Sequence, residues 1–106
     1  MEQVDDWRSQ RRRILEKAKR IIVKVGSAVL TTDRGLDERV VNRLADQIAA
    51  LHDRGLEIVL VTSGAVAAGR YVLGPGSGTG CMVHKQAASA VGQSRLMHSY
   101  DEAFGR

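Results

Sequence analysis

A chain of 106 residues is long enough for one small domain and too short for two. Hydrophobic residues make up 43% and charged residues 26% of it, which is typical of a globular protein in water and argues against general disorder and against a membrane span. A net charge of +4 raises the question of a nucleic-acid partner.

The first twenty residues form a basic extension that supplies much of this charge. Arg11, Arg12 and Arg13 are consecutive, whereas acids and bases nearly balance after Arg20. We interpret residues 1–20 as a solvated helical extension rather than a nucleic-acid arm, because short like-charge runs are often only solvated surface. An apolar edge of the extension could dock on the rest of the chain; its residues are Trp7, Ile14, Leu15 and Ala18.

Two β-branched runs on either side of a helical pattern predict a parallel crossover. Residues 21–25 and 58–62 have the composition of strands. Between them, a helix is expected to begin after Asp37 as N-cap and to stop at Gly55; its apolar residues at helical spacing are Val40, Leu44, Ile48 and Leu51. Strand, helix and strand in this order favour a right-handed parallel unit. Because both strands are apolar on each face, we expect them to be buried.

Two more helices are predicted after the second strand. Residues 65–71 and 85–104 have helical composition, the latter with Ala90, Met97 and Phe104 on one face, and residues 73–83 favour a loop. Two strands and three helices cannot cover both faces of a parallel sheet. We therefore expect an α/β chain that is a truncated, partial three-layer α/β/α fold.

The loop after the first strand is the first candidate site, because open α/β sheets bind ligands at the carboxyl ends of their strands. Lys24 lies inside an apolar strand, where an ammonium without a partner is costly, so we expect it to reach the sheet end or to meet a phosphate. An ion pair with a carboxylate is the alternative. Gly26 would let the backbone approach a ligand, and Ser27 offers a hydroxyl and an N–H group.

The loop after the second strand is the second candidate site. Ser63, Gly64 and Ala65 open a predicted helix, whose free N–H groups could hold a carboxylate or a phosphate. A simple N-cap by Ser63 is the alternative. Ser63 is not a hydrolase nucleophile, because the nucleophile elbow requires glycine at the positions of Val61 and Ala65.

The glycine-rich residues 74–80 resemble a phosphate loop only in composition. They lack the lysine of a Walker loop and the spacing of the dinucleotide fingerprint. We predict a mobile loop, of a kind that often closes over substrates.

Cysteine and histidine are too few for a metal site. Cys81 and His84 lie close in sequence, but His52 and His98 lie elsewhere, so we assign no metal-binding cluster. A single cysteine cannot pair within the chain, which fits a reducing compartment. The first twenty residues also lack the features of a secretion or transit signal, so a cytoplasmic location is expected.

Three segments together carry a resemblance to a known family. Residues 22–30 read IVKVGSAVL, residues 59–70 read VLVTSGAVAAGR, and Lys85-Gln86-Ala87-Ala88 precedes Ala90-Val91-Gly92-Gln93. In this order they closely resemble the glutamate 5-kinases of the amino acid kinase family, over about residues 20–104. Related kinases for aspartate, acetylglutamate, uridylate and carbamate resemble the first strand and its glycine loop.

The resemblance implies phosphorylation of the side-chain carboxylate of L-glutamate by ATP with Mg²⁺, the first step of proline biosynthesis. It implies that Lys24 contacts the phosphates of ATP and acts in catalysis, with Gly26 and Ser27 in the same loop. Ser63 would bind glutamate, and Gly64 and Ala65 would offer N–H groups near the reacting carboxylate and phosphate.

The resemblance also bears on completeness and partners. Residues 21–106 would be the glutamate-binding, amino-terminal part of the kinase domain, and residues 1–20 would be additional to the shortest members. The remaining glutamate-site residues, a second lysine and most of the nucleotide lobe lie beyond Arg106 in this family. We therefore expect a chain that is inactive alone and part of a homo-oligomer when complete. A noncatalytic binding fragment and a basic partner-binding module are the alternatives.

Overall fold

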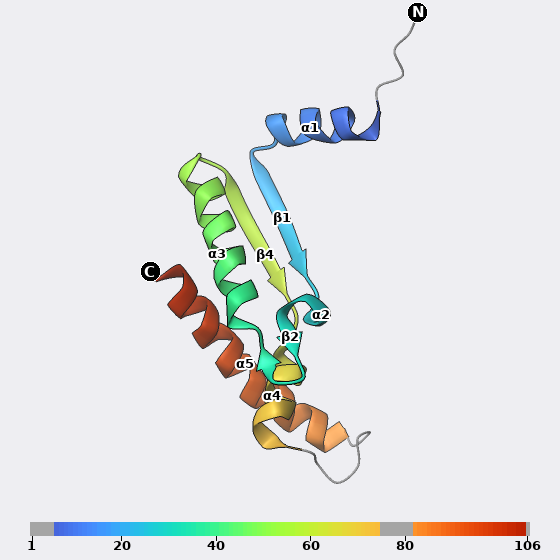
Figure 1. The fold of residues 1–106 in the computed structure, drawn as a ribbon, viewed down its shortest axis with the longest axis vertical. Coiled ribbons are helices and arrows are strands. Elements are labelled where there is room, and N and C mark those ends of the chain that lie inside the picture. Colours follow the sequence, from blue (N-terminus) through green and yellow to red (C-terminus); the bar gives the residue numbers. More distant parts are fainter. Residues whose placement is uncertain (1–5, 75–81, 106) are drawn as a thin grey trace, which may run out of the picture.

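The computed structural model describes residues 6–74 and 82–105, which form an elongated molecule of helices and strands (Figure 1). Along the chain the elements are α1 (Trp7–Lys17), β1 (Arg20–Val25), α2 (Ser27–Leu30), β2 (Thr31–Thr32), β3 (Gly35–Leu36), α3 (Glu38–Asp53), β4 (Glu57–Thr62), α4 (Ala65–Leu73) and α5 (Met82–Phe104).

The predicted parallel crossover is confirmed. Strands β1 and β4 pair in parallel, with Arg20 opposite Glu57 at one end and Val25 opposite Thr62 at the other, and α3 lies between them in the sequence. An exposed ion pair of 2.7 Å joins Arg20 Nη2 to Glu57 Oε2 where the two strands begin. The connection also contains the short helix α2 and the antiparallel pair β2–β3, which the sequence did not indicate.

Helix α3 begins and ends where the sequence predicts. The Asp37 carboxylate accepts a hydrogen bond of 3.1 Å from the Arg39 backbone N–H, as an N-cap residue does. After the helix, Gly55 has φ of +89°, a left-handed conformation that glycine adopts without a Cβ penalty. The helix turns its apolar stripe inward; its buried residues are Val41, Ala45 and Ile48.

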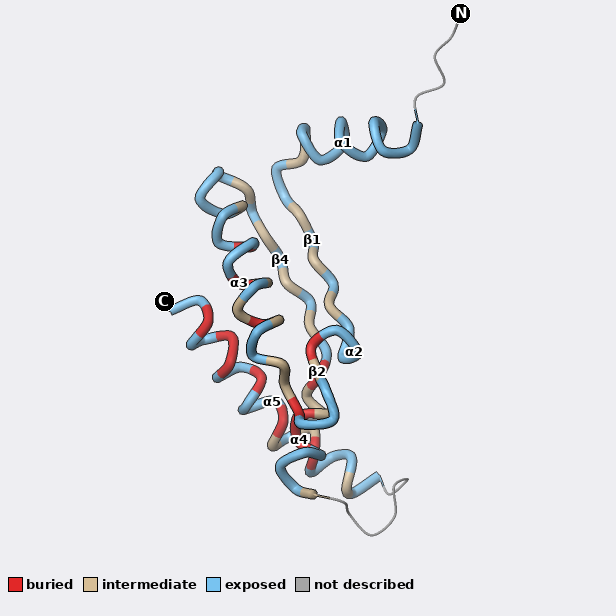
Figure 2. The backbone as a smooth tube through the Cα atoms, in the orientation of Figure 1, coloured by how far each residue is buried: buried red, intermediate tan, exposed pale blue. Residues whose placement is uncertain are grey.

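The core lies between α3, α5 and one face of the sheet (Figure 2). Val25 of β1 and Leu60 of β4 pack against this core, and the Thr62 and Tyr100 hydroxyls share a hydrogen bond of 2.8 Å that ties β4 to α5. Six buried residues form the core cluster: Leu30, Val41, Ala45, Leu96, Tyr100 and Ala103.

The prediction that both strands are buried on each face is wrong for the outer face of the sheet. Exposure alternates along both strands, and Ile22 (63%), Val59 (45%) and Val61 (47%) are exposed. Helices cover only the opposite face, so the part of the chain that the structure describes has two layers of the α/β/α arrangement.

The last two helices are longer than predicted. Leu73 belongs to α4, and Met82 and Val83 belong to α5, although all three were predicted as loop; residues 75–81 lie outside the described residues. The predicted face of α5 is also wrong, because Met97 and Phe104 are 43% and 45% exposed. The buried face instead consists mainly of small side chains: Ala88, Gly92, Leu96, Ser99, Tyr100 and Ala103.

Helices α4 and α5 cross with their backbones in contact. A Cβ atom at Gly69 would overlap the carbonyl oxygen of Ala88, and one at Gly92 would overlap the carbonyl oxygen of Ala65. Only glycine permits so close a crossing at these two positions. Since Ala65 is the first residue of α4, this crossing sets where α4 begins relative to the sheet.

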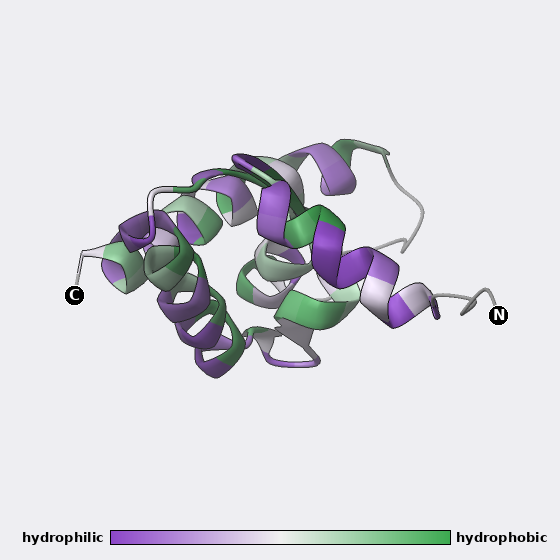
Figure 3. Ribbon diagram, turned by 90° about the horizontal axis from the view of Figure 1, so that it is seen from above, coloured by the Kyte–Doolittle hydropathy of each residue, from purple (hydrophilic) through white to green (hydrophobic). Residues whose placement is uncertain are grey.

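Helix α1 lies across the amino-terminal end of β1 (Figure 1), and its residues are mostly hydrophilic (Figure 3). No residue in it is buried. The Asp6 carboxylate caps it by accepting a hydrogen bond of 2.8 Å from the Ser9 N–H. Trp7, Ile14 and Leu15 are each at least half exposed, so the expected apolar edge is largely uncovered. Among the described helices, none is long and apolar enough to cross a membrane.

Candidate functional site

The two predicted loops meet at the carboxyl ends of the parallel strands. Gly26 and Ser27 follow β1, and Ser63 and Gly64 follow β4. The Ser63 N–H donates a hydrogen bond of 2.9 Å to the carbonyl oxygen of Val25, which continues the strand pairing by one residue and fixes one loop against the other.

The start of α4 offers free N–H groups to this junction. Gly64 is the N-cap residue, with φ of +111° and no side-chain hydrogen bond to the helix. The Ala68 N–H donates a hydrogen bond of 3.0 Å to the Gly64 carbonyl oxygen, and this is the first hydrogen bond of the helix. The N–H groups of residues 65–67 therefore have no partner within the helix. The alternative of an N-cap by Ser63 is therefore wrong.

A pocket of about 390 Å³ opens beside this helix start. It brings together four of the predicted site residues: Ser27, Ser63, Gly64 and Ala65. Two hydroxyl side chains and the positive end of a helix thus face one cavity, an arrangement suited to an anion such as a carboxylate or a phosphate.

Arg70 also lines this pocket, although no role was predicted for it from the sequence. Helical spacing in the sequence could have indicated that Arg70 belongs to the site. Residues three and four apart share a face of a helix, and Arg70 is three residues after Ala67 and four after Val66. Both of these residues line the same pocket. The guanidinium adds a positive charge that can pair bidentately with an anion.

Lys24 and Gly26 do not line this pocket. Lys24 is exposed, opposite Val61, and borders a separate shallow hollow with Arg43 and Val29, so its ammonium is not buried within the apolar strand. That Lys24 meets a phosphate stays a prediction. A Cβ atom at Gly26 would contact nothing within 4 Å, so no part of the described chain makes glycine necessary there.

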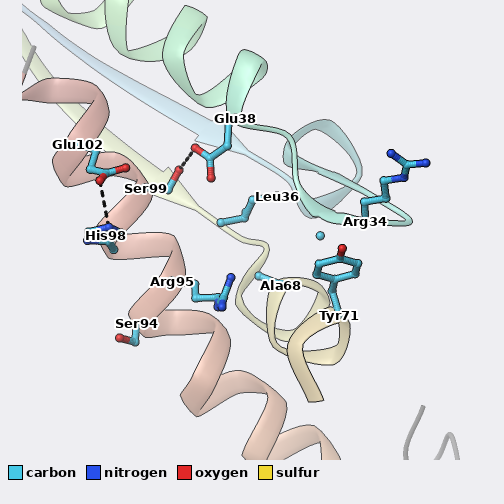
Figure 4. Close-up of a pocket in the computed structure, with 11 residues that line it drawn as sticks. Arg34, Leu36, Glu38, Ala68, Tyr71, Ser94, Arg95, His98, Ser99 and Glu102 are labelled. Atoms are coloured by element: carbon cyan, nitrogen blue, oxygen red, sulfur yellow. Dashed lines mark hydrogen bonds and ion pairs between the residues drawn. The ribbon is translucent and has the colours of Figure 1, made fainter. Parts of the chain in front are cut away.

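A second, larger pocket of about 500 Å³ lies between the β2–β3 connection, α4 and α5 (Figure 4). Ser99 Oγ donates a hydrogen bond of 2.6 Å to Glu38 on one side, and His98 lies 3.2 Å from Glu102. No site was predicted here from the sequence. Its lining carries both signs of charge, so it shows no clear preference for an anion or a cation.

The candidate site is therefore built from backbone N–H groups, hydroxyls and one arginine. Within residues 6–74 and 82–105, no group of three or more His, Cys, Asp or Glu side chains is placed to hold a metal ion. Cys81, considered above with His84, lies outside the described residues.

The sequence of the chain is similar to those of known proteins. A sequence model of the amino acid kinase family matches residues 19–106. The chain is 61% identical to the glutamate 5-kinase of Oleidesulfovibrio alaskensis over 101 residues, which cover 95% of this chain and 27% of that protein. It is 58% identical to the glutamate 5-kinase of Maridesulfovibrio salexigens over 92% of this chain, and 48% identical to that of Syntrophus aciditrophicus over 91%.

The chain spans about a quarter of the length of these relatives. The family match extends from just before β1 through α5 and includes both loops of the candidate site. The chain belongs to the amino acid kinase family.

Proposed function

We propose that this chain forms the glutamate-binding side of an L-glutamate 5-kinase, which transfers the terminal phosphoryl group of ATP to the side-chain carboxylate of glutamate. The observation that carries the proposal is the pocket at the start of α4, where Ser27, Ser63 and free N–H groups face one anion-sized cavity. The names of the relatives support the choice of glutamate and of phosphoryl transfer.

The reaction needs no protein nucleophile. A glutamate carboxylate oxygen attacks the terminal phosphorus, an O–P bond forms, and the bond from that phosphorus to the bridging oxygen of ADP breaks. Catalysis then rests on positioning and on stabilising negative charge on the transferred group. The product is glutamyl 5-phosphate, an intermediate on the way to proline.

The chain's own residues fit these tasks. Ser63 would hold glutamate by its hydroxyl, and the N–H groups of Gly64 and Ala65 would face the reacting carboxylate and phosphate. Lys24, on a long flexible stem near the end of β1, would bring its ammonium to the ATP phosphates together with the Gly26-Ser27 loop. Mg²⁺ would arrive with the nucleotide and neutralise its phosphates, since magnesium commonly binds through substrate phosphates and few carboxylates.

A chimera tests the proposal. This chain replaces the matching 101-residue segment of the O. alaskensis glutamate 5-kinase, and glutamate-dependent ADP formation is measured. We expect an active enzyme, and we expect Lys24→Ala to lower kcat by about 100-fold, the usual loss for one charge-stabilising donor. Lys19→Ala, which removes a lysine outside the site, is the matched control and should leave kcat unchanged.

Two results would reject the assignment. If the chimera folds and binds ATP and glutamate but shows no turnover, the chain is a noncatalytic binding fragment of its family. If Lys24→Ala turns over as fast as Lys19→Ala, Lys24 has no role in phosphoryl transfer. Sedimentation of the active chimera also tests our proposal that the complete protein is a homo-oligomer.

A further inference from the structure

The groove between α1, the start of β1 and the end of α3 with the turn that follows it is not explained by the proposed kinase function. The family match begins at residue 19, after the end of α1 at Lys17. Helix α1 forms one wall of this groove, and it lies at the opposite end of the sheet from the candidate site (Figure 1).

The floor of the groove is apolar. Leu15 of α1 is 50% exposed, and three half-buried aliphatic side chains continue the surface toward the end of α3. With a volume of about 600 Å³, the groove is the size of a site for several side chains. The aliphatic residues that line it are Leu15, Ile21, Leu51 and Leu56.

The rim of the groove is strongly basic. Among the described residues, four arginines line it and Glu16 is the one acid. The guanidinium groups of two of these arginines, Arg8 and Arg11, lie 5.1 and 5.0 Å from the centre of the Trp7 ring, within cation–π distance. The four lining arginines are Arg8, Arg11, Arg12 and Arg54.

We propose that this groove binds an acidic amphipathic helix of a protein partner. A helix that lays apolar side chains into a groove matches the aliphatic floor. Carboxylates on the flanks of such a helix match the arginine rim, because guanidinium groups bind carboxylates bidentately. A single ligand of this kind would contact both the basic side chains and the apolar surface of α1.

The floor favours a polypeptide over a nucleic acid. Single-stranded nucleic acids are held by stacking on aromatic side chains as well as by charge, and none of the described residues that line this groove is aromatic. Trp7 lies nearby, but two guanidinium groups already lie over its ring. A phosphate backbone would also leave the four aliphatic side chains without an apolar partner.

The test measures binding of a fluorescent helical peptide with leucine on one face and glutamate on the other. Fluorescence anisotropy with the complete 106-residue chain should show saturable binding. Arg54→Glu and Arg12→Glu should each weaken it about tenfold or more, as loss of a charge pair at an interface does. Lys17→Glu makes the same change of charge on α1 outside the groove, and we expect it to weaken binding only about twofold, through long-range charge.

Two further measurements test whether the aliphatic floor of the groove contributes to binding. Leu15→Ser, on the exposed helix, should weaken binding without unfolding the chain, and circular dichroism checks the fold of each variant. A second peptide that keeps every glutamate but carries serine in place of leucine should bind far more weakly.

Four outcomes would overturn the proposal. Equal losses for Lys17→Glu and Arg54→Glu would mean that net charge alone attracts the peptide. Equal binding of the serine peptide would mean that the floor is unused. Tighter binding of a single-stranded oligonucleotide of the same charge would assign the groove to nucleic acid, and self-association lost in Arg54→Glu would assign it to a second copy of this chain.

Discussion

Gly92 is the residue on which the position of the candidate site depends most directly. Its missing side chain lets α5 touch the carbonyl oxygen of Ala65, the first residue of α4, and a Cβ atom there would also lie 2.7 Å from the Gly69 nitrogen. Backbone atoms cannot move aside as the end of a flexible side chain can. The geometry at the start of α4 is thus set by a residue that does not line the pocket.

We predict that Gly92→Ala destabilises the chain by about 1–3 kcal/mol, the usual cost of overpacking, and displaces the start of α4. Thermal unfolding measures the first effect, and amide chemical shifts of residues 64–67 measure the second. Gly26→Ala is the matched control, because its new Cβ meets nothing within 4 Å. Equal stability of the two variants would show that the helices separate without cost.

At the same scale, the sequence predicted which residues would gather but not how each is used. Ser27, Ser63, Gly64 and Ala65 share one pocket because parallel strands end at the same edge of a sheet, a rule that needs no coordinates. Lys24 was expected to reach the sheet end or to meet a phosphate, and it lies exposed one residue before the end of β1, outside the pocket. Local sequence does not specify what covers the outer face of the sheet beside it. Arg70 was missed although its spacing places it on one helix face with Val66 and Ala67, because local sequence does not specify which face of α4 turns toward the pocket.

Among the elements, those with strong local patterns were predicted well. The two β-branched runs became β1 and β4, and the stripe between Asp37 and Gly55 became α3. The pair β2–β3 has only two residues in each strand, so its pairing depends on tertiary contacts such as the packing of Gly35 against Tyr71. Strands of two residues are too short to show the alternation of apolar and polar residues from which a strand is predicted.

The orientation of α5 was not predictable from large apolar residues. Its buried face holds alanines, a glycine and a serine, because close approach to α4 requires small side chains. The larger side chains Met97 and Phe104 point elsewhere and stay partly exposed. Hydrophobic periodicity therefore indicated the wrong face of a helix whose packing is decided by size.

The start of α1 depends on the charge of one carboxylate, and this makes it sensitive to pH. The Ser9 backbone N–H lowers the pKa of Asp6 below its ordinary value of 3.8, with a smaller lowering by the Ser9 side chain. A lowered pKa in the folded state means that the cap contributes stability above 3.8 and loses it as pH falls through the folded-state pKa.

We therefore predict that the first turn of α1 frays in acid. The Ser9 amide resonance should move as pH falls below 3.8, and the Asp6 carboxyl resonance should titrate below its ordinary value. Asp6→Ala should abolish the Ser9 transition while leaving the rest of the spectrum in place. Titration of Asp6 at its ordinary value would show that the cap is absent in solution.

As a whole molecule, the chain is extended for its length. Its radius of gyration is 18.0 Å, whereas a compact domain of this size has about 13 Å. A sheet of two strands, with helices on one face only, leaves Ile22, Val59 and Val61 in contact with water. Neighbouring exposed apolar side chains of this kind are typical of protein interfaces and of surfaces prone to self-association.

Replacing Val59 and Val61 by threonine separates two roles of that face. In the 106-residue chain, we predict that the double variant folds as well as the parent, because threonine keeps the β-branched shape, and that it self-associates less in sedimentation experiments.

In the chimera with the O. alaskensis glutamate 5-kinase, we expect the additional polypeptide to cover the face. Each threonine hydroxyl would then be buried without a partner, at a cost of about 1–3 kcal/mol, and the melting temperature should fall. Val83→Thr on α5, where the side chain is 71% exposed, is the control and should change neither measurement. If the chimera tolerates the double variant as well as Val83→Thr, the outer face of the sheet stays in water in the longer protein, and the family's third layer does not form over these two strands.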